Sequence, residues 1–203
     1  MKEKNARIVA SLISTMGLDT SGRLRQFPVV IACVKLEKKI SILDDLRNKV
    51  RKRHRALSSR RVIKAKDLTD EELRWFVRRI NFPFAVMKVT SNDFQKIKKK
   101  YRMRKNWDFK FLGACYYHVI SRLYSKDVKE ILIDRDYVKS TMLIILRTVT
   151  NLFSLKEEVP HISVSSSINS EIQFADLIAG TYRRLRLKSK LIRFDEKLLK
   201  HIY

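Results

Sequence analysis

Two aspartates of the chain stand at the ends of apolar stretches, where a carboxylate can face a ligand. Asp19 follows the stretch Ala6–Leu18 and opens a Ser-Gly turn, and Asp134 follows the apolar run Ile131–Ile133. Ligands of open α/β sheets gather outside the carboxyl ends of strands, so both carboxylates are expected to face one groove. Ordinary loop chemistry is the alternative: Asp19 as a turn residue, and Asp134 in a solvated loop that also contains Asp136.

Asp176 lies within a helical pattern rather than at a strand end. The helical repeat places it on the same face as Ile172, Ala179 and Gly180, a face otherwise suited to packing. Desolvation of an ionised carboxylate costs several kcal/mol unless a cation or hydrogen-bond donors compensate. Two explanations follow: an ion pair with Arg183 on the same helix, or a metal site shared with other carboxylates.

Asp19, Asp134 and Asp176 together form a set of oxygen ligands on two strands and one helix. Hard divalent cations such as Mg²⁺ and Mn²⁺ prefer oxygen ligands. One or two of these ions can stabilise the attacking and leaving oxygens of a phosphodiester during hydrolysis. If they meet in one site, the three aspartates are candidate catalytic and metal-ligating residues for such hydrolysis, and the turn, loop and ion-pair alternatives stay open.

The charge of the chain is strongly unbalanced: 45 Lys and Arg residues stand against 21 Asp and Glu residues, a formal net charge of +24. Such an excess in 203 residues favours a polyanionic partner, and nucleic acid, DNA or RNA, is the leading class. The positive residues gather in three runs, which can also be solvated faces of helices. The residues predicted to contact nucleic acid are Arg51, Lys52, Arg53, Arg55, Lys98, Lys99, Lys100, Arg102, Arg104, Lys105, Arg183 and Arg184.

Aromatic side chains are interleaved with the second basic run. Tyr101 and Trp107 can stack on bases while neighbouring cations hold phosphates, a pattern of single-strand binding. Trp107 can instead anchor the helix that follows it. His118 and His161 can act as bases, but their apolar sequence neighbours favour hydrogen-bonded packing residues.

Several protein classes are excluded by what the sequence lacks. Cys33 and Cys115 lie far apart and outside any metal-ligand spacing, which favours a reducing, intracellular and cytoplasmic location. The apolar runs are far shorter than the about 20 residues of a membrane-spanning helix, and the apolar stripe of the first basic helix is too narrow for membrane binding. The motifs of P-loop ATPases, α/β-hydrolases and zinc metalloproteases are missing.

The elements that must position these residues alternate between strand and helix. Two apolar stretches, 6–18 and 27–36, predict a hairpin. Predicted helices cover 42–57, 69–80, 109–123, 138–153 and 171–187, and predicted strands cover 84–89, 130–133 and 161–165. The second of these helices begins with a capping box formed by Thr69 and Glu72. The alternation predicts an α/β fold with a mixed sheet, in one domain over residues 1–203 with a basic insertion near residues 90–108.

Three short motifs resemble known families. Residues 17–23 (GLDTSGR) are similar to the GIDEAGR opening of type 2 ribonucleases H, and also resemble the DESG opening of an uncharacterised RNase H-like family, the domain of unknown function 3800. Residues 173–180 (QFADLIAG) and 131–135 (ILIDR) resemble a helix and a strand end of that second family. The resemblance implies an RNase H-like mixed central sheet flanked by helices, and a metal-dependent nuclease core with Asp19, Asp134 and Asp176 as ligands.

The chain departs from these families at two acidic positions. Thr20 follows the first aspartate where both families have glutamate, and Val62 stands where the second family often has glutamate. Asp136, Glu171 and Asp67 are candidates to supply a missing carboxylate oxygen. The predicted metal ligands are therefore Asp19, Asp134, Asp176, Asp136 and Glu171.

Two functions compete on these grounds. The first is a divalent-metal-dependent nuclease, with an aspartate cluster in a basic groove and Mg²⁺ or Mn²⁺ as the cofactor. The alternative is a non-catalytic nucleic-acid-binding protein on a degenerate RNase H-like fold, because Thr20 and Val62 weaken the ligand set. A structural component of a ribonucleoprotein explains the charge but gives the aspartates no role.

Overall fold

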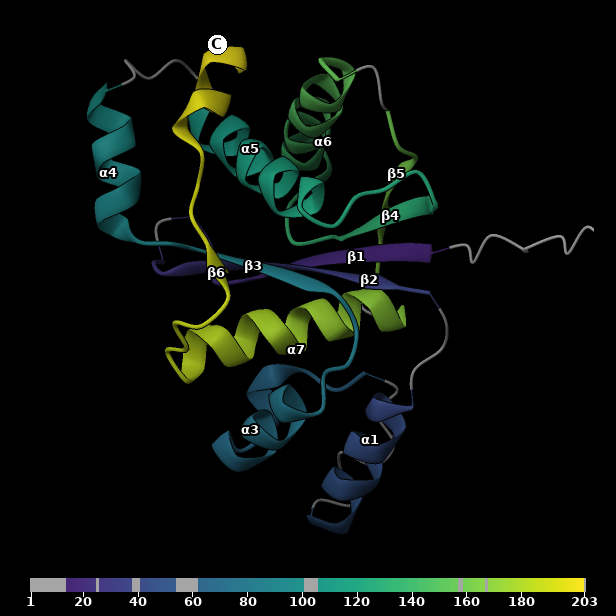
Figure 1. The fold of residues 1–203 in the computed structure, drawn as a ribbon. Coiled ribbons are helices and arrows are strands. Elements are labelled where there is room, and N and C mark those ends of the chain that lie inside the picture. Colours follow the sequence, from purple (N-terminus) through teal and green to yellow (C-terminus); the bar gives the residue numbers. More distant parts are fainter. Residues whose placement is uncertain are drawn as a thin grey trace, which may run out of the picture.

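The computed structural model describes residues 14–24, 26–37, 41–53, 62–100, 106–156, 159–166 and 168–202, with the backbone alone for residues 51–53. A six-stranded sheet in the order β5-β4-β1-β2-β3-β6 lies at its centre (Figure 1). The strands are β1 (Ser14–Ser21), β2 (Val29–Leu36), β3 (Phe84–Val89), β4 (Val128–Asp134), β5 (Ile162–Ser165) and β6 (Leu191–Ile192).

The strand directions bring two predicted site residues together. Strand β2 pairs antiparallel with β1 and β3, whereas β4 pairs in parallel with β1 and β5, and β6 pairs in parallel with β3. Because β1 and β4 are parallel, their carboxyl ends lie at the same edge of the sheet. The register pairs Leu18 with Ile133, so the next residues, Asp19 and Asp134, occupy neighbouring positions on the two strands.

Helices cover both faces of the sheet (Figure 1). One face packs against α4 (Ser91–Lys100), α5 (Trp107–Ser121) and α6 (Lys139–Ser154). The other face packs against α7 (Ser170–Arg184), with α1 (Ile42–Arg53) and α3 (Asp70–Arg78) beyond it. Two short 3₁₀ helices, η1 (Ala65–Asp67) and η2 (Glu196–His201), complete the elements. The sheet thus separates two apolar cores, and alternate residues of β2 and of β3 belong to opposite cores.

Local sequence explains the start of α3 and the close packing of α7. Thr69 accepts a hydrogen bond from the Glu72 N–H (3.2 Å), and the Glu72 carboxylate accepts one from the Thr69 N–H (2.8 Å), which confirms the predicted capping box. Gly17 on β1 faces the first turn of α7, where a Cβ at this position would lie 2.3 Å from the backbone carbon of Glu171. Glycine at residue 17 therefore allows α7 to lie directly against β1.

The predicted α/β class with a mixed sheet and flanking helices is confirmed, as is the antiparallel hairpin. The predicted end of the first strand is wrong, because β1 covers Ser14–Ser21. Residues 6–13 lie outside the described part of the chain, so that part of the predicted range stays a prediction. The strand continues through polar residues because β2 supplies partners as far as Ser21. In the predicted basic insertion, residues 91–100 form α4, which buries Phe94 and Ile97 in the core.

Cys33 and Cys115 are both buried as free thiols. Within the described residues, every helix is too short or too polar to cross a membrane.

Candidate metal centre and basic surface

Three carboxylates converge at the edge where β1 and β4 end. Asp19 comes from β1, Asp134 is the last residue of β4, and Asp136 follows two residues later. One oxygen from each carboxylate lies within 4.8 Å of the others. We call these three residues the aspartate cluster. Parallel pairing creates it, because neighbouring positions on β1 and β4 supply the first two members.

Asp19 is the most enclosed member of the cluster, with 4% of its surface exposed. It lies inside β1, where it pairs with Ala32, so the predicted place after the strand is wrong. Its Oδ1 accepts a 2.6 Å hydrogen bond from the Thr20 N–H. Burial, followed by the charges of Asp136, Asp176 and Asp134, raises the pKa of Asp19 well above its ordinary value. The ionised form is therefore strongly disfavoured without a compensating cation.

Thr20 contacts the cluster from the position where a glutamate was expected. Its hydroxyl donates a short hydrogen bond to the Asp136 carboxylate. Thr20 adds no carboxylate to the site, but its hydrogen bond restrains Asp136. Thr20 thus stands where the resembling families have glutamate, and it contacts a carboxylate of the cluster directly.

Asp176 lies beside the cluster on α7, and its oxygens are outside the group that converges within 4.8 Å. Its Oδ2 accepts a 3.1 Å hydrogen bond from the Ala65 N–H. Burial raises the pKa of Asp176, while the Ala65 N–H and the charge of Lys64 oppose that shift. The charge of Asp176 raises the pKa of Asp19, and the charges of Asp134 and Asp136 raise the pKa of Asp176, so α7 places a fourth carboxylate near the cluster.

The other predicted oxygen ligands lie apart from the cluster. Glu171 is five residues before Asp176 on α7, about 140° around the helix, and its carboxylate accepts a hydrogen bond from the Ser170 hydroxyl (3.1 Å). Asp67 accepts a hydrogen bond from the Lys64 N–H (3.2 Å) in the η1 turn. Glu171 was expected to approach the site from its sequence proximity to Asp176, but the helical repeat turns it away.

The cluster has the chemistry of a divalent-cation site. It offers oxygen ligands alone, as Mg²⁺ and Mn²⁺ prefer. Burial and then Asp136 raise the pKa of Asp134, so two members of the cluster favour protonation when no cation is bound. The Arg135 N–H and then the charge of Lys64 oppose the shift at Asp134, and the Thr20 N–H opposes the shift at Asp19. A bound divalent cation fits this unbalanced negative charge.

The predicted nucleic-acid contacts fall into three groups. Lys98, Lys99 and Lys100 are exposed at the end of α4, and Lys100 forms an ion pair with Glu196 (2.7 Å). Arg183 and Arg184 lie in the last turn of α7. The remaining predicted contacts have side chains outside the described part of the structure: Arg51, Lys52, Arg53, Arg55, Arg102, Arg104 and Lys105.

A basic cavity of about 690 Å³ is lined by residues next to Asp19 and Asp176. It is lined by Ala65, the hydrogen-bond partner of Asp176, and by Ser21, which lies two residues after Asp19. The cations that line it are Lys66, Lys88, Arg183, Arg184 and Arg186. Three of these cations, Lys66, Lys88 and Arg186, were not singled out from the sequence. Lys66 and Lys88 are outside the dense basic runs, so only folding reveals that they share a cavity with Arg183.

Four other sequence interpretations can be compared with the structure. Trp107 is 3% exposed and stacks on Phe111 (5.4 Å between ring centroids), so it anchors α5 and is closed to a base. His118 is buried as expected, whereas the prediction for His161 is wrong: its side chain is 71% exposed and lies 3.5 Å from Glu130. The Arg183 guanidinium donates a hydrogen bond to the Gln26 carbonyl (3.3 Å). The structure therefore favours the second explanation for Asp176, a metal site shared with other carboxylates, over an ion pair with Arg183.

Comparison with known proteins supports the fold. No protein-family model and no curated protein matches the sequence. Solved structures do match: a point mutant of Bst-RNase HIII superposes with a TM-score of 0.55 at 14% sequence identity, and Bst-RNase HIII in complex with Mn²⁺ with a TM-score of 0.53 at 14% identity. Each match covers 85% of this chain and 52% of the other, so the chain spans about half the length of these proteins. The chain therefore has an RNase H-like fold, as its motifs implied.

Proposed function

We propose that this RNase H-like chain is a divalent-metal-dependent nuclease that hydrolyses phosphodiester bonds of DNA or RNA. The observation that carries the proposal is the aspartate cluster. One carboxylate oxygen of buried Asp19 lies within 4.8 Å of a carboxylate oxygen of Asp134 and of Asp136. A fold likeness alone does not specify an activity, so the argument depends on the site.

The residues of the cluster have distinct roles in this proposal. Asp19 and Asp134 are the catalytic ligands carried by neighbouring parallel strands, and Asp136 replaces the carboxylate that Thr20 does not supply. Asp176, oriented by the Ala65 N–H, completes the negative site from the side of α7. One or two Mg²⁺ or Mn²⁺ ions held there would supply positive charge to the reacting phosphate and lower the pKa of water.

The basic residues orient the substrate in this proposal. The basic cavity beside Ala65 presents several cations near the aspartate cluster. These cations can hold the phosphodiester backbone while the reacting phosphate lies at the carboxylates. One of the matched solved structures is a ribonuclease in complex with Mn²⁺, which supports both the substrate class and the metal.

A non-catalytic nucleic-acid-binding protein is the second candidate. The observation that favours it is Thr20, whose hydroxyl contacts Asp136 at the position where the resembling families have a glutamate. In that case the cations bind the nucleic-acid backbone, and the aspartates contribute only to the fold of the protein.

A cleavage panel separates the two functions. End-labelled single-stranded DNA, duplex DNA, RNA and an RNA/DNA hybrid are incubated with Mn²⁺, Mg²⁺ or EDTA. Wild-type protein is compared with Asp19→Asn, Asp176→Asn and, as a matched control, Asp45→Asn, which alters an exposed carboxylate in the first turn of α1. Metal-dependent cleavage that only the first two variants lose supports the nuclease. Intact substrates that the protein nevertheless shifts in a gel support the binding module.

A further inference from the structure

A second cavity lies under β6, beyond the basic cavity. Its volume is about 620 Å³, and it lies between α4 and the C-terminal segment that contains β6 and η2. Its cations are Lys88, Lys96, Lys188 and Arg193, and its apolar wall includes Phe111 and Phe194. We call it the β6 cavity. Lys88 lines both this cavity and the basic cavity, so the two adjoin.

The sheet register places Lys88 on the same side as the aspartate cluster. Ser21 pairs with Val30, and Val30 pairs with Lys88, so these three residues form one row across β1, β2 and β3. Paired residues on adjacent strands project from the same face, and Asp19 is two residues before Ser21 on that face. Two interstrand spacings separate Ser21 from Lys88, or about 10 Å. The row therefore leads from the cluster to Lys88, the residue that lines both cavities.

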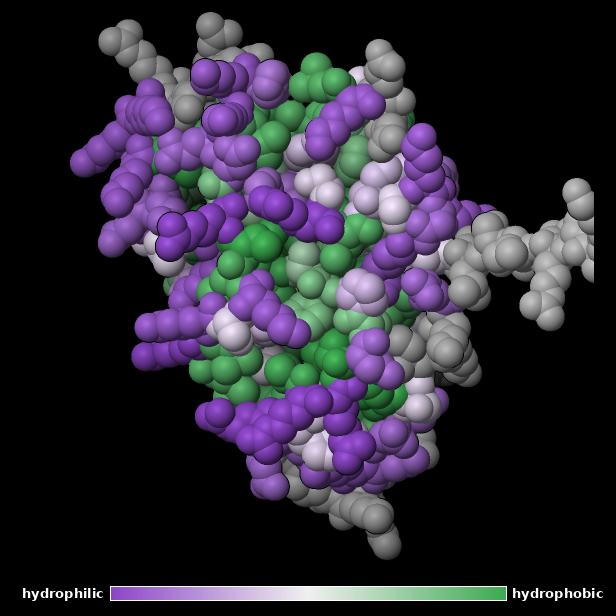
Figure 2. Space-filling model, in the orientation of Figure 1, coloured by the Kyte–Doolittle hydropathy of each residue, from purple (hydrophilic) through white to green (hydrophobic). Residues whose placement is uncertain are grey.

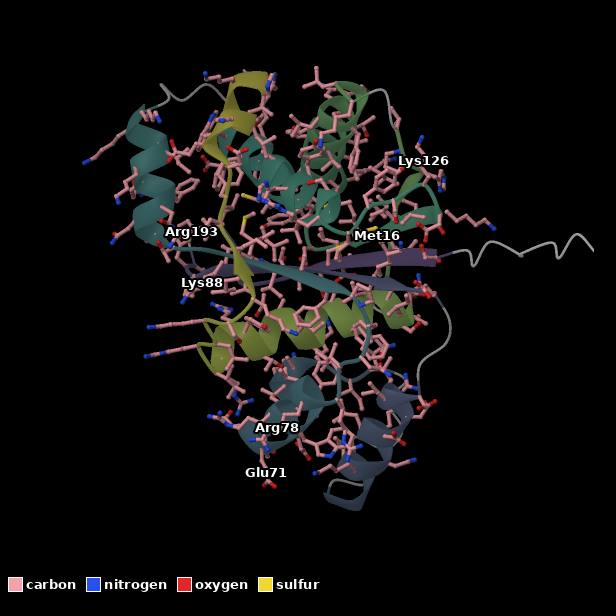
Figure 3. All side chains as sticks on the ribbon, in the orientation of Figure 1. Met16, Glu71, Arg78, Lys88, Lys126 and Arg193 are labelled. Carbon is pink, nitrogen blue, oxygen red and sulfur yellow. The ribbon has the colours of Figure 1, made fainter. Side chains whose placement is uncertain are left out.

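The charge of the β6 cavity is not balanced by its own acids. Glu196 is engaged with Lys100 (2.7 Å), and Asp93 accepts hydrogen bonds from the Thr90 N–H (3.0 Å) and hydroxyl (2.6 Å) at the start of α4. In the described part of the chain, the four cations of the cavity form no ion pair with a carboxylate. Figure 3 shows Lys88 and Arg193 at the same end of the sheet, and in Figure 2 hydrophilic side chains flank hydrophobic residues in this region.

The apolar wall distinguishes this cavity from a simple phosphate site. Phe194 is half-buried and packs edge-on against Phe111, with 5.2 Å between the ring centroids. Phe111 is 1% exposed and closed to a base, so Phe194 is the aromatic side chain of the wall that a base can contact. Cations that hold phosphates beside an aromatic wall that contacts bases form the usual combination for single-stranded nucleic acid. A base paired in a duplex is stacked on its neighbours and cannot enter such a pocket without unpairing.

We propose that the basic cavity and the β6 cavity form one track for single-stranded nucleic acid, in which Lys88 holds the backbone between them and the β6 cavity receives an unpaired nucleotide. The inference rests on the proposed function for the identity of the polyanion. It adds the strandedness of the substrate and the direction in which the strand leaves the aspartate cluster.

Binding measured in EDTA tests the track without requiring cleavage. The double variant Lys188→Ala/Arg193→Ala removes two cations of the β6 cavity. The control Lys126→Ala/Lys129→Ala removes two exposed cations around the start of β4, and Figure 3 shows Lys126 at the opposite end of the sheet. Both variants change the net charge equally. Fluorescence anisotropy gives the affinity for a single-stranded oligonucleotide and for a blunt duplex over a series of salt concentrations.

The track predicts a specific change in salt dependence. Loss of two phosphate contacts reduces the slope of log affinity against log salt by about 1.4 for single strands, which corresponds to a roughly 25-fold loss of affinity at 0.1 M salt relative to 1 M. The control should keep the wild-type slope, and duplex binding should change less than single-strand binding. Equal slopes for the two double variants would overturn the track, as would an equal loss on duplex. Absence of cleavage would contradict the nuclease proposal and leave this result unaffected.

Discussion

The Ala65 N–H donates a 3.1 Å hydrogen bond to the Asp176 carboxylate, although the two residues are 111 positions apart. Gly180, one helical turn after Asp176, allows this contact, because a Cβ at residue 180 would lie 2.2 Å from the Ala65 Cβ. The aspartate and the glycine of the QFADLIAG segment therefore act on the same neighbour. Asp176 accepts the hydrogen bond of the Ala65 N–H, and Gly180 leaves room for Ala65 to approach the helix.

Gly180→Ala should destabilise the protein and disturb Asp176. Alanine normally stabilises a helix by about 1 kcal/mol relative to glycine. Here overpacking against Ala65 costs about 1–3 kcal/mol, so a net loss of about 1 kcal/mol is expected in urea unfolding. The double variant Ala65→Gly/Gly180→Ala removes the opposing Cβ and should recover part of this loss. Additive effects of the two substitutions would contradict the contact.

Asp19→Asn should stabilise the metal-free protein and remove most of its stabilisation by Mn²⁺. Burial and the neighbouring carboxylates raise the pKa of Asp19, so a neutral amide should make the protein more stable than wild type in EDTA at neutral pH. Wild type should gain about 2.7 kcal/mol when free Mn²⁺ is 100-fold above its dissociation constant, and the variant should lose most of this gain. Thermal unfolding with and without Mn²⁺ provides the measurement.

The control for this experiment is Asp45→Asn, an exposed carboxylate on α1. It should leave the Mn²⁺-dependent shift of the unfolding temperature unchanged. A wild-type protein whose unfolding temperature does not respond to Mn²⁺ or Mg²⁺ would argue against the metal site.

Thr20→Val should weaken metal binding without removing a ligand. The substitution keeps the shape of the side chain and deletes the hydroxyl that donates to Asp136. Loss of such a hydrogen bond to a ligand typically lowers metal affinity about 10–100-fold. Calorimetric titration with Mn²⁺ measures the effect, and Thr15→Val on the same strand is the matched control. Equal affinities of the two variants would show that Thr20 does not restrain the site.

His118 should make the protein less stable in mild acid. Burial, followed by the charge of Arg122, lowers the pKa of His118 below its ordinary value of 6.5. The unfolded chain therefore binds a proton in a pH range where the native protein does not, so the unfolding free energy should fall as the pH drops below about 6.5. His118→Gln should flatten this part of the profile, measured by urea unfolding between pH 5.5 and 7.5. An unchanged slope would contradict the prediction.

Local sequence determined several elements of this protein because their signals act over a few residues. The Thr69–Glu72 capping box predicted the start of α3, and the isolated apolar run ending at Asp134 predicted a buried strand. Composition indicated a polyanionic partner, and this stays a prediction. The helical repeat correctly placed Asp176 on a packed face of α7, and the motifs around Asp19 and Asp176 implied the RNase H-like fold that the solved structures support.

Only the tertiary structure decided which oxygens meet. Asp136 and Thr20 are 116 positions apart, and their contact depends on the parallel register of β1 and β4. Lys66 and Lys88 stand outside the dense basic runs, and their shared cavity depends on the packing of η1 and β3 around α7. Sequence patterns report local periodicity, whereas a site depends on distances between elements that are far apart along the chain. Those distances are set by strand register and by close approaches such as Gly180 against Ala65.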